Sequence, residues 1–140
     1  MDLDALETSF DLIAPKGDEL VEIFYARLFE TAPAVKPLFA STDMARQRMM
    51  LLSALVLLRK SFRNLDSIVP ALKRMGARHV GYGAAPAHYP VVGEVLIGAM
   101  AEVAGPSWEP RFADAWGDAF AVVAGAMLEG AAEAEFAVAA

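Results

Sequence analysis

The apolar residues of this chain recur three or four positions apart, which is the spacing of one face of an α-helix. Four series show the interval most clearly: Leu3, Leu6, Phe10 and Ile13; Leu20, Phe24 and Leu28; Tyr89, Val92, Leu96, Met100 and Val103; and Phe112, Trp116, Phe120, Val123 and Met127. No segment alternates apolar and polar residues as a half-buried strand does. The pattern therefore predicts an all-α protein.

Prolines and capping residues mark where the predicted helices begin and end. The two prolines of segment 33–39 leave room for a short helical turn only. The Ser-Thr-Asp run 41–43 supplies N-cap residues for a long helix over about 44–62, and Ser67 supplies one for a helix over about 67–79.

The rest of the chain follows the same rules. Prolines start one helix near 86–90 and another near 107–110. About seven helices result, and because no repeat or linker separates them, we expect one domain over residues 1–140. The alanine-rich segment of about 129–140 is expected to be a frayed end.

The composition excludes several classes of protein. Without cysteine, the chain has no disulfide, no thiolate metal site and no thiol nucleophile. Its longest strongly apolar run, residues 49–58, is about half of what a bilayer span needs, so we expect a soluble protein without a membrane partner. The acidic N-terminus is unlike a targeting signal and indicates a cytoplasmic location.

Positive charge is concentrated in the middle of an acidic chain. The net charge is −6, yet residues 44–93 hold eight of the twelve Lys and Arg residues and one acidic residue, Asp66. This local excess suits a bound anion such as a haem with its two propionates. A solvated basic face, or a weak nucleic-acid or membrane contact, is the alternative. Because no binding motif accompanies the charge, we expect no nucleic-acid partner.

The chain has two histidines, His79 and His88, nine residues apart. Their spacing does not fit a zinc site, and no other cluster supplies the three or four ligands that zinc needs. A lone histidine on an amphipathic helix is more often structural than a ligand. A single histidine can nevertheless hold iron when a haem brings the other ligands. His79 follows Leu72 and Met75 on an apolar face, which directs it toward the interior.

Six short stretches carry a family resemblance across nearly the whole chain: FYARLF at 24–29, PLF at 37–39, NLDSIVPAL at 64–72, GARHVGYG at 76–83, HYPVVG at 88–93 and AWGDAF at 115–120. In this order they resemble bacterial single-domain globins of the flavohaemoglobin lineage, including Vitreoscilla-type and neuroglobin-like members. The resemblance implies a globin fold whose helices surround a haem b, iron protoporphyrin IX.

The resemblance also implies roles on the proximal side of that haem. His79 resembles the proximal iron ligand, and Phe39 resembles the aromatic residue that packs against the haem edge. Tyr89 matches a tyrosine that holds the proximal histidine. His88 matches a position that does not touch iron.

On the distal side, Tyr25 resembles the tyrosine that donates a hydrogen bond to bound oxygen. Counting without a gap places the distal polar residue at Gln47 and an apolar residue one turn later at Leu51. A shift in register would bring in Arg46 or Arg48 instead. An ordinary buried tyrosine and a surface glutamine remain the alternatives for Tyr25 and Gln47.

The function implied is reversible binding of oxygen, and of carbon monoxide or nitric oxide, at ferrous haem iron, for oxygen storage, transport or delivery. One alternative is a nitric oxide dioxygenase with an external reductase, because the chain ends where the flavin and nicotinamide domains of flavohaemoglobins would begin. Gas sensing and a cofactor-free helical regulator are the others.

One departure from the flavohaemoglobin pattern concerns the carboxylate that strengthens the proximal histidine. Counting from the AWGDAF stretch places that position at Ala131. Glu129 and Glu133 are each two residues away, about 200° around a helix. We therefore expect neither carboxylate to reach His79.

Overall fold

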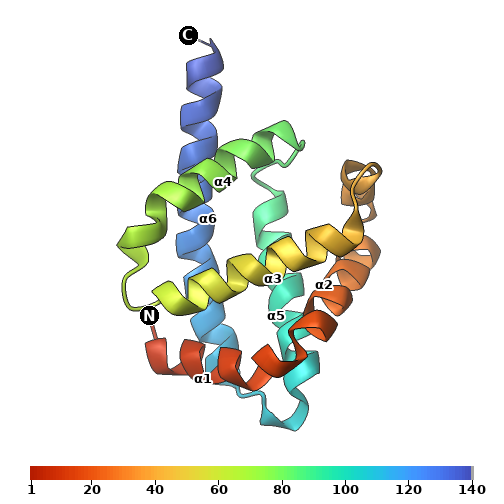
Figure 1. Ribbon diagram of the computed structural model, residues 1–140, viewed down its shortest axis with the longest axis vertical. Coiled ribbons are helices and arrows are strands. Elements are labelled where there is room, and N and C mark those ends of the chain that lie inside the picture. Colours follow the sequence, from red (N-terminus) through yellow and green to blue (C-terminus); the bar gives the residue numbers. More distant parts are fainter. Residues whose placement is uncertain (140) are drawn as a thin grey trace.

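The computed structural model describes residues 1–139, with side chains as far as Glu135. Residues 1–139 contain helices and no strand, which confirms the all-α prediction. The α-helices are α1 (Leu3–Ile13), α2 (Gly17–Thr31), α3 (Met44–Ser61), α4 (Val69–Gly81), α5 (His88–Ala104) and α6 (Pro110–Ala139) (Figure 1). The 3₁₀-helices are η1 (Ala14–Lys16), η2 (Pro33–Phe39), η3 (Leu65–Ile68) and η4 (Gly105–Ser107). The six α-helices and η2 correspond to the seven predicted segments.

The caps of two helices show how far local sequence sets the helix ends. The carboxylate of Asp43 accepts hydrogen bonds from the backbone N–H groups of Ala45 (3.1 Å) and Arg46 (3.3 Å), so the aspartate of the capping run begins α3. The prediction that Ser67 caps the next helix is wrong. Its hydroxyl instead donates to the carbonyl of Asn64 at 2.7 Å, because η3 adds a helical turn before α4.

In the C-terminal segment, for which fraying is expected, α6 continues to Ala139 and projects beyond the other helices (Figure 1). Two contacts with α4 hold this part of α6. Gly130 lies against the backbone of Lys73, with no room for a side chain between them. The Lys73 ammonium lies 3.1 Å from a carboxylate oxygen of Glu129 and equally close to one of Glu133. These contacts, together with the high helix propensity of alanine, explain the extra turns.

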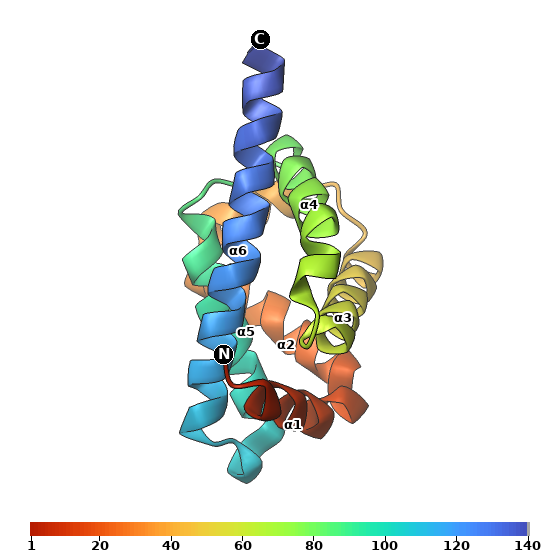
Figure 2. The ribbon, with the colours of Figure 1, turned by 90° about the vertical axis from the view of Figure 1, so that its left-hand side faces the viewer.

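Helix α4 crosses α6 with direct contact between the two backbones (Figure 1), and Figure 2 shows the two helices side by side. Gly76 lies against the backbone carbonyl of Met127, where a Cβ atom would collide with it. This contact is one turn before His79, so it determines how far the end of α4 lies from α6. No helix within residues 1–139 combines the length and the apolar character needed to cross a bilayer.

The centre of the core is Trp116 of α6, which is fully buried. Its indole N–H donates to the hydroxyl of Ser9 at 2.8 Å, and that hydroxyl donates to the carbonyl of Ala5 at 2.6 Å. The rings of Phe10 and Phe62 pack against the indole. The one polar atom of the buried indole is therefore paired, and α1, α3 and α6 meet around it.

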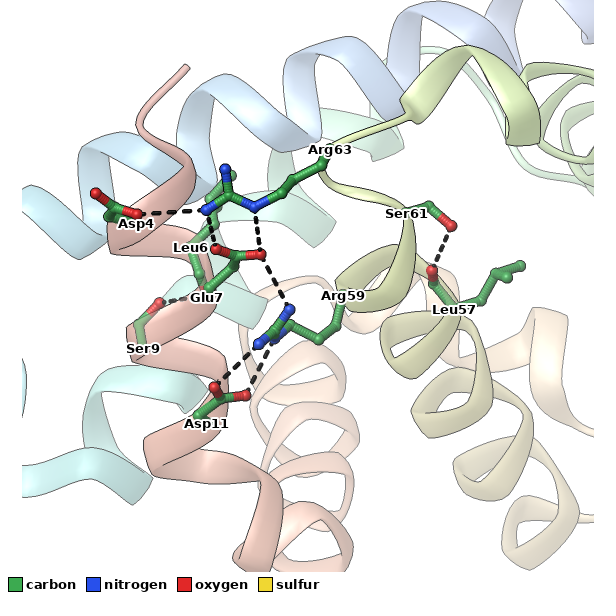
Figure 3. Close-up of polar contacts among 9 residues, drawn as sticks. All are labelled: Asp4, Leu6, Glu7, Ser9, Asp11, Leu57, Arg59, Ser61 and Arg63. Carbon is green, nitrogen blue, oxygen red and sulfur yellow. Dashed lines mark hydrogen bonds and ion pairs between the residues drawn. The ribbon is translucent and has the colours of Figure 1, made fainter.

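A network of charged side chains joins α1 to the C-terminal half of α3 and to the turn that follows it (Figure 3). Arg59 makes two hydrogen bonds of 3.0 Å with Asp11 and one of 3.2 Å with Glu7. Arg63 bonds Glu7 at 2.6 and 3.1 Å, and lies 3.4 Å from Asp4. The network orients α3, the helix that carries two of the predicted distal residues, Gln47 and Leu51.

These ion pairs also change the interpretation of the basic segment 44–93. Arg59 and Arg63 are neutralised by α1, and Lys73 is neutralised by α6. The positive charge that can face a bound anion therefore comes from at most the other five bases, which are Arg46, Arg48, Lys60, Arg74 and Arg78.

The network makes stability in acid depend on two carboxylates of α1. A hydrogen bond from Arg63 lowers the pKa of Glu7, and one from Arg59 lowers the pKa of Asp11. A carboxylate with a lowered folded pKa stabilises the fold above its unfolded pKa of about 4, and this contribution is lost as the pH falls through the folded value. We therefore expect the free energy of unfolding, measured with urea, to fall more steeply below about pH 5 in the wild type than in Glu7→Gln.

A matched control is Glu22→Gln on the exposed side of α2, which should keep the wild-type dependence on pH. If Glu7→Gln also kept it, the α1–α3 network would contribute nothing to stability in acid.

Candidate functional site

A cavity of about 240 Å³ lies between helices α3, α4, α5 and α6. Leucine, valine, alanine and methionine side chains form most of its wall. Among its lining residues, all in the described part of the chain, nitrogen or oxygen atoms of side chains come from His79, His88 and Tyr89. An apolar cavity with a few polar groups is typical of a binding site for a largely apolar organic ligand.

His79 is the first of these polar groups, half-buried near the end of α4. Its Nδ1 atom lies 2.7 Å from the backbone carbonyl oxygen of Met75. Because a carbonyl only accepts hydrogen bonds, Nδ1 must carry the proton. The other ring nitrogen, Nε2, then keeps its lone pair. This is the tautomer in which an imidazole binds a metal through Nε2.

His88 lines the same cavity from the first turn of α5, which the sequence analysis did not foresee. Its Nδ1 accepts a hydrogen bond of 3.0 Å from the backbone N–H of Ala85. In the neutral ring Nε2 therefore carries the proton. The two histidines are thus held in opposite tautomers, and His79 is the one with a lone pair on Nε2.

Leu51 of α3 and Tyr89 of α5 also line this cavity. Burial raises the pKa of the Tyr89 phenol, so it stays protonated at neutral pH. The structure thus brings together three of the predicted site residues, His79, Leu51 and Tyr89.

Tyr25 and Gln47 form a second group, which is not part of the cavity wall; Gln47 precedes the wall residue Leu51 by one turn of α3. The side-chain amide of Gln47 donates a 3.0 Å hydrogen bond to the hydroxyl oxygen of Tyr25, which is 6% exposed. Burial raises the pKa of Tyr25, whereas the Gln47 hydrogen bond and the Arg48 charge lower it. Of the three candidates for the distal position, Gln47 is the one bonded to Tyr25, while Arg46 is exposed.

Phe39 belongs to this second group and not to the wall of the His79 cavity. Its ring packs edge-on against Tyr25, with 5.8 Å between ring centroids, and against Phe29, with 5.4 Å. It also lines an open cleft of about 560 Å³ beside η2. The structure therefore places Phe39 next to Tyr25, the predicted distal tyrosine. A contact between Phe39 and a haem edge stays a prediction.

The two glutamates near Ala131 point to a different face of α4 from His79. Both Glu129 and Glu133 pair with Lys73, and more than half of each side chain is exposed. Lys73 precedes His79 by six residues, which is about 120° away around the helix. This agrees with the expectation that neither carboxylate reaches His79.

Within the described residues, no three His, Cys, Asp or Glu side chains gather closely enough to hold a metal ion. A metal at His79 would take its other ligands from water or from a cofactor. Haem is a cofactor that provides them, and it is largely apolar like the cavity wall.

The globin family model matches residues 22–127 of this chain. The match covers more than half of the 140 residues and includes both histidines. The chain belongs to the globin family. Globins hold haem iron through a proximal histidine and bind diatomic gases there.

Curated relatives of this globin are flavohemoproteins. Those of Bacillus thuringiensis subsp. konkukian and Bacillus cereus are each 33% identical to it over 133 residues, which is 94% of this chain and 33% of theirs. This globin therefore spans about a third of the length of the curated relatives that it matches.

Solved structures similar to this globin agree on the fold. One is an engineered carbene transferase from a proposed nitric oxide dioxygenase of Rhodothermus marinus, with a TM-score of 0.88, 27% identity and coverage of 99% of this chain and 96% of that one. Another is a bacterial globin from Campylobacter jejuni, with a TM-score of 0.81, 22% identity and coverage of 94% of each chain. The predicted globin fold is confirmed.

Proposed function

We propose that this globin binds haem b through His79 and binds oxygen reversibly at the ferrous iron, for storage, transport or delivery. The observation that carries the proposal is the hydrogen bond between Nδ1 of His79 and the carbonyl of Met75. It holds the imidazole in the tautomer that can bind iron, on a residue that lines an apolar cavity. When bound, haem supplies an iron with an open position for a diatomic gas.

Tyr25 and Gln47 supply the polar groups for that gas. Since the Tyr25 oxygen accepts a hydrogen bond from Gln47, its own O–H proton remains available for another acceptor. Burial keeps the phenol protonated by raising its pKa. A donor of this kind stabilises a ligand that gains partial negative charge, as oxygen does at ferrous iron.

An absorption spectrum tests the proposal directly. The purified protein, supplied with haem, should show a strong Soret band that shifts on reduction and again under carbon monoxide. Haem that remains spectrally free after mixing with the folded protein would overturn the proposal.

A nitric oxide dioxygenase that works with a separate reductase is the second candidate. The similarity to the proposed dioxygenase of Rhodothermus marinus favours it. Such an enzyme needs its iron reduced again in every cycle. Sustained consumption of nitric oxide, dependent on an added flavin reductase and its nicotinamide substrate, would move the assignment from oxygen binding to this enzyme.

The ion pairs of Lys73 lead to a prediction that separates the two functions. Because Glu129 and Glu133 are held by Lys73, Glu129→Gln and Glu133→Gln should leave the iron–histidine stretching frequency of the ferrous protein unchanged in resonance Raman spectra. A carboxylate bonded to the histidine would raise this frequency, because it strengthens the donation of the ring to iron.

The opposite result would be a high iron–histidine stretching frequency in the wild type that falls in Glu129→Gln or in Glu133→Gln. It would show that a carboxylate of α6 reaches His79 and would favour the dioxygenase.

A further inference from the structure

His88 lines the cavity but takes no part in the iron and gas contacts proposed for His79, Tyr25 and Gln47. It begins α5 and is half-buried, between the exposed residue Ala87 and the wall residue Tyr89. The backbone N–H of Ala85 occupies its Nδ1. The ring therefore offers one remaining polar group, the N–H at Nε2, and this group is a donor.

An occupant of the cavity that displaces water from His88 leaves this N–H without a partner unless the occupant itself carries an acceptor. Leaving such a group without a partner after water is displaced costs about 1 to 3 kcal/mol. The other polar side chains of the wall are His79, whose Nε2 is the proposed iron ligand, and Tyr89. An acceptor carried by the occupant of the cavity is thus the natural partner of His88.

Haem has two carboxylates on one edge of an otherwise apolar ring, so it brings acceptors of the required kind. We propose that His88 binds a carboxylate of the bound haem through its Nε2–H, and so acts as a positioning residue. This inference rests on the proposed haem binding. The two histidines then have complementary roles, His79 toward iron and His88 toward a carboxylate. The backbone group at each Nδ1 sets the role: a carbonyl for His79 and an N–H for His88.

The test compares haem with haem dimethyl ester, in which both carboxylates are neutral. The rate of cofactor loss to an excess of a haem-scavenging protein is measured for the wild type, His88→Phe and His88→Gln. His88→Phe should lose haem about three- to tenfold faster than the wild type. This effect is smaller than the roughly ten- to hundredfold expected for a buried hydrogen bond to a charged group, because His88 is half-exposed. The ester should leave both proteins at nearly the same rate.

His88→Gln retains an N–H donor and should recover much of the wild-type rate with haem. In all three proteins the absorption spectrum should be the same, because the contact does not involve iron. Equal acceleration with haem and with the ester would show that His88 acts only through packing, and would overturn the inference. A changed coordination spectrum in His88→Phe would also overturn it, by showing that His88 is an iron ligand.

The wild-type spectrum separates this inference from the function on which it rests. A wild-type protein that binds neither haem nor the ester would overturn the proposed function, and the role of His88 with it. If the wild type binds haem but loses it at the same rate as His88→Phe, the role of His88 alone is overturned.

Discussion

Replacing His79 with alanine is expected to abolish stable haem binding, whereas replacing His88 with alanine should leave the absorption spectrum of the bound haem unchanged. His79 has its Nε2 lone pair free, because Nδ1 donates to Met75, while His88 has a proton on Nε2. A cofactor that binds only the folded state stabilises it by about 4 kcal/mol at a thousand times its dissociation constant. The melting temperature of the wild type and of His88→Ala should therefore rise on addition of haem, and that of His79→Ala should not.

Chemical rescue distinguishes a lost ligand from a misfolded protein. In His79→Gly, imidazole from solution can occupy the space of the missing ring and should restore a Soret band with histidine-like coordination. Circular dichroism of the same sample reports whether the helices have formed. Equal haem content in His79→Ala and His88→Ala would contradict the assignment of His79.

Replacing Tyr25 with phenylalanine is expected to speed the release of oxygen by roughly ten- to a hundredfold. The change removes the hydroxyl that accepts from Gln47 and is free to donate, while it keeps the ring that packs against Phe39. Hydrogen bonds to charged groups contribute about 1.5 to 3 kcal/mol, which corresponds to that change in rate. Stopped-flow measurement of oxygen dissociation from the ferrous protein gives the value.

Carbon monoxide provides the control for this variant, because it gains less charge at the iron than oxygen does. Its dissociation rate should change far less in Tyr25→Phe. Gln47→Leu should have a smaller effect on oxygen than Tyr25→Phe, since it leaves the phenolic O–H in place. Similar shifts for both gases in Tyr25→Phe would mean that Tyr25 acts through its bulk.

The helices and their order follow from local sequence because each depends on residues close together in the chain. Apolar spacing identifies the buried face of a helix, and prolines and Asp43 mark where helices begin. The prediction that Ser67 caps a helix failed because η3 adds a turn before α4 that apolar spacing does not show. Segment 129–139 is helical because Gly130 and two glutamates of α6 contact α4.

The site was predictable to the extent that the family motifs identify its residues. His79, Leu51 and Tyr89 share one cavity, and Tyr25 bonds to Gln47 across a separation of 22 residues. The sequence alone did not decide whether Gln47, Arg46 or Arg48 is the distal polar residue. A shift of one residue rotates a helix face by about 100°, and the length of the preceding loop does not fix the register of α3. The structure selects Gln47 as the partner of Tyr25 through one hydrogen bond.

The sequence by itself determined an all-α globin and named the histidine that we propose as the iron ligand, because helical periodicity and short motifs are properties of neighbouring residues. The tertiary structure alone decided which groups meet. It placed His88 in the cavity, gave the two histidines opposite tautomers and held Glu129 and Glu133 on Lys73. The physical reason is that these contacts depend on how helices are rotated and how closely they cross. Here the backbone contact of Gly76 with Met127 brings α4 and α6 together, and no local pattern encodes that distance.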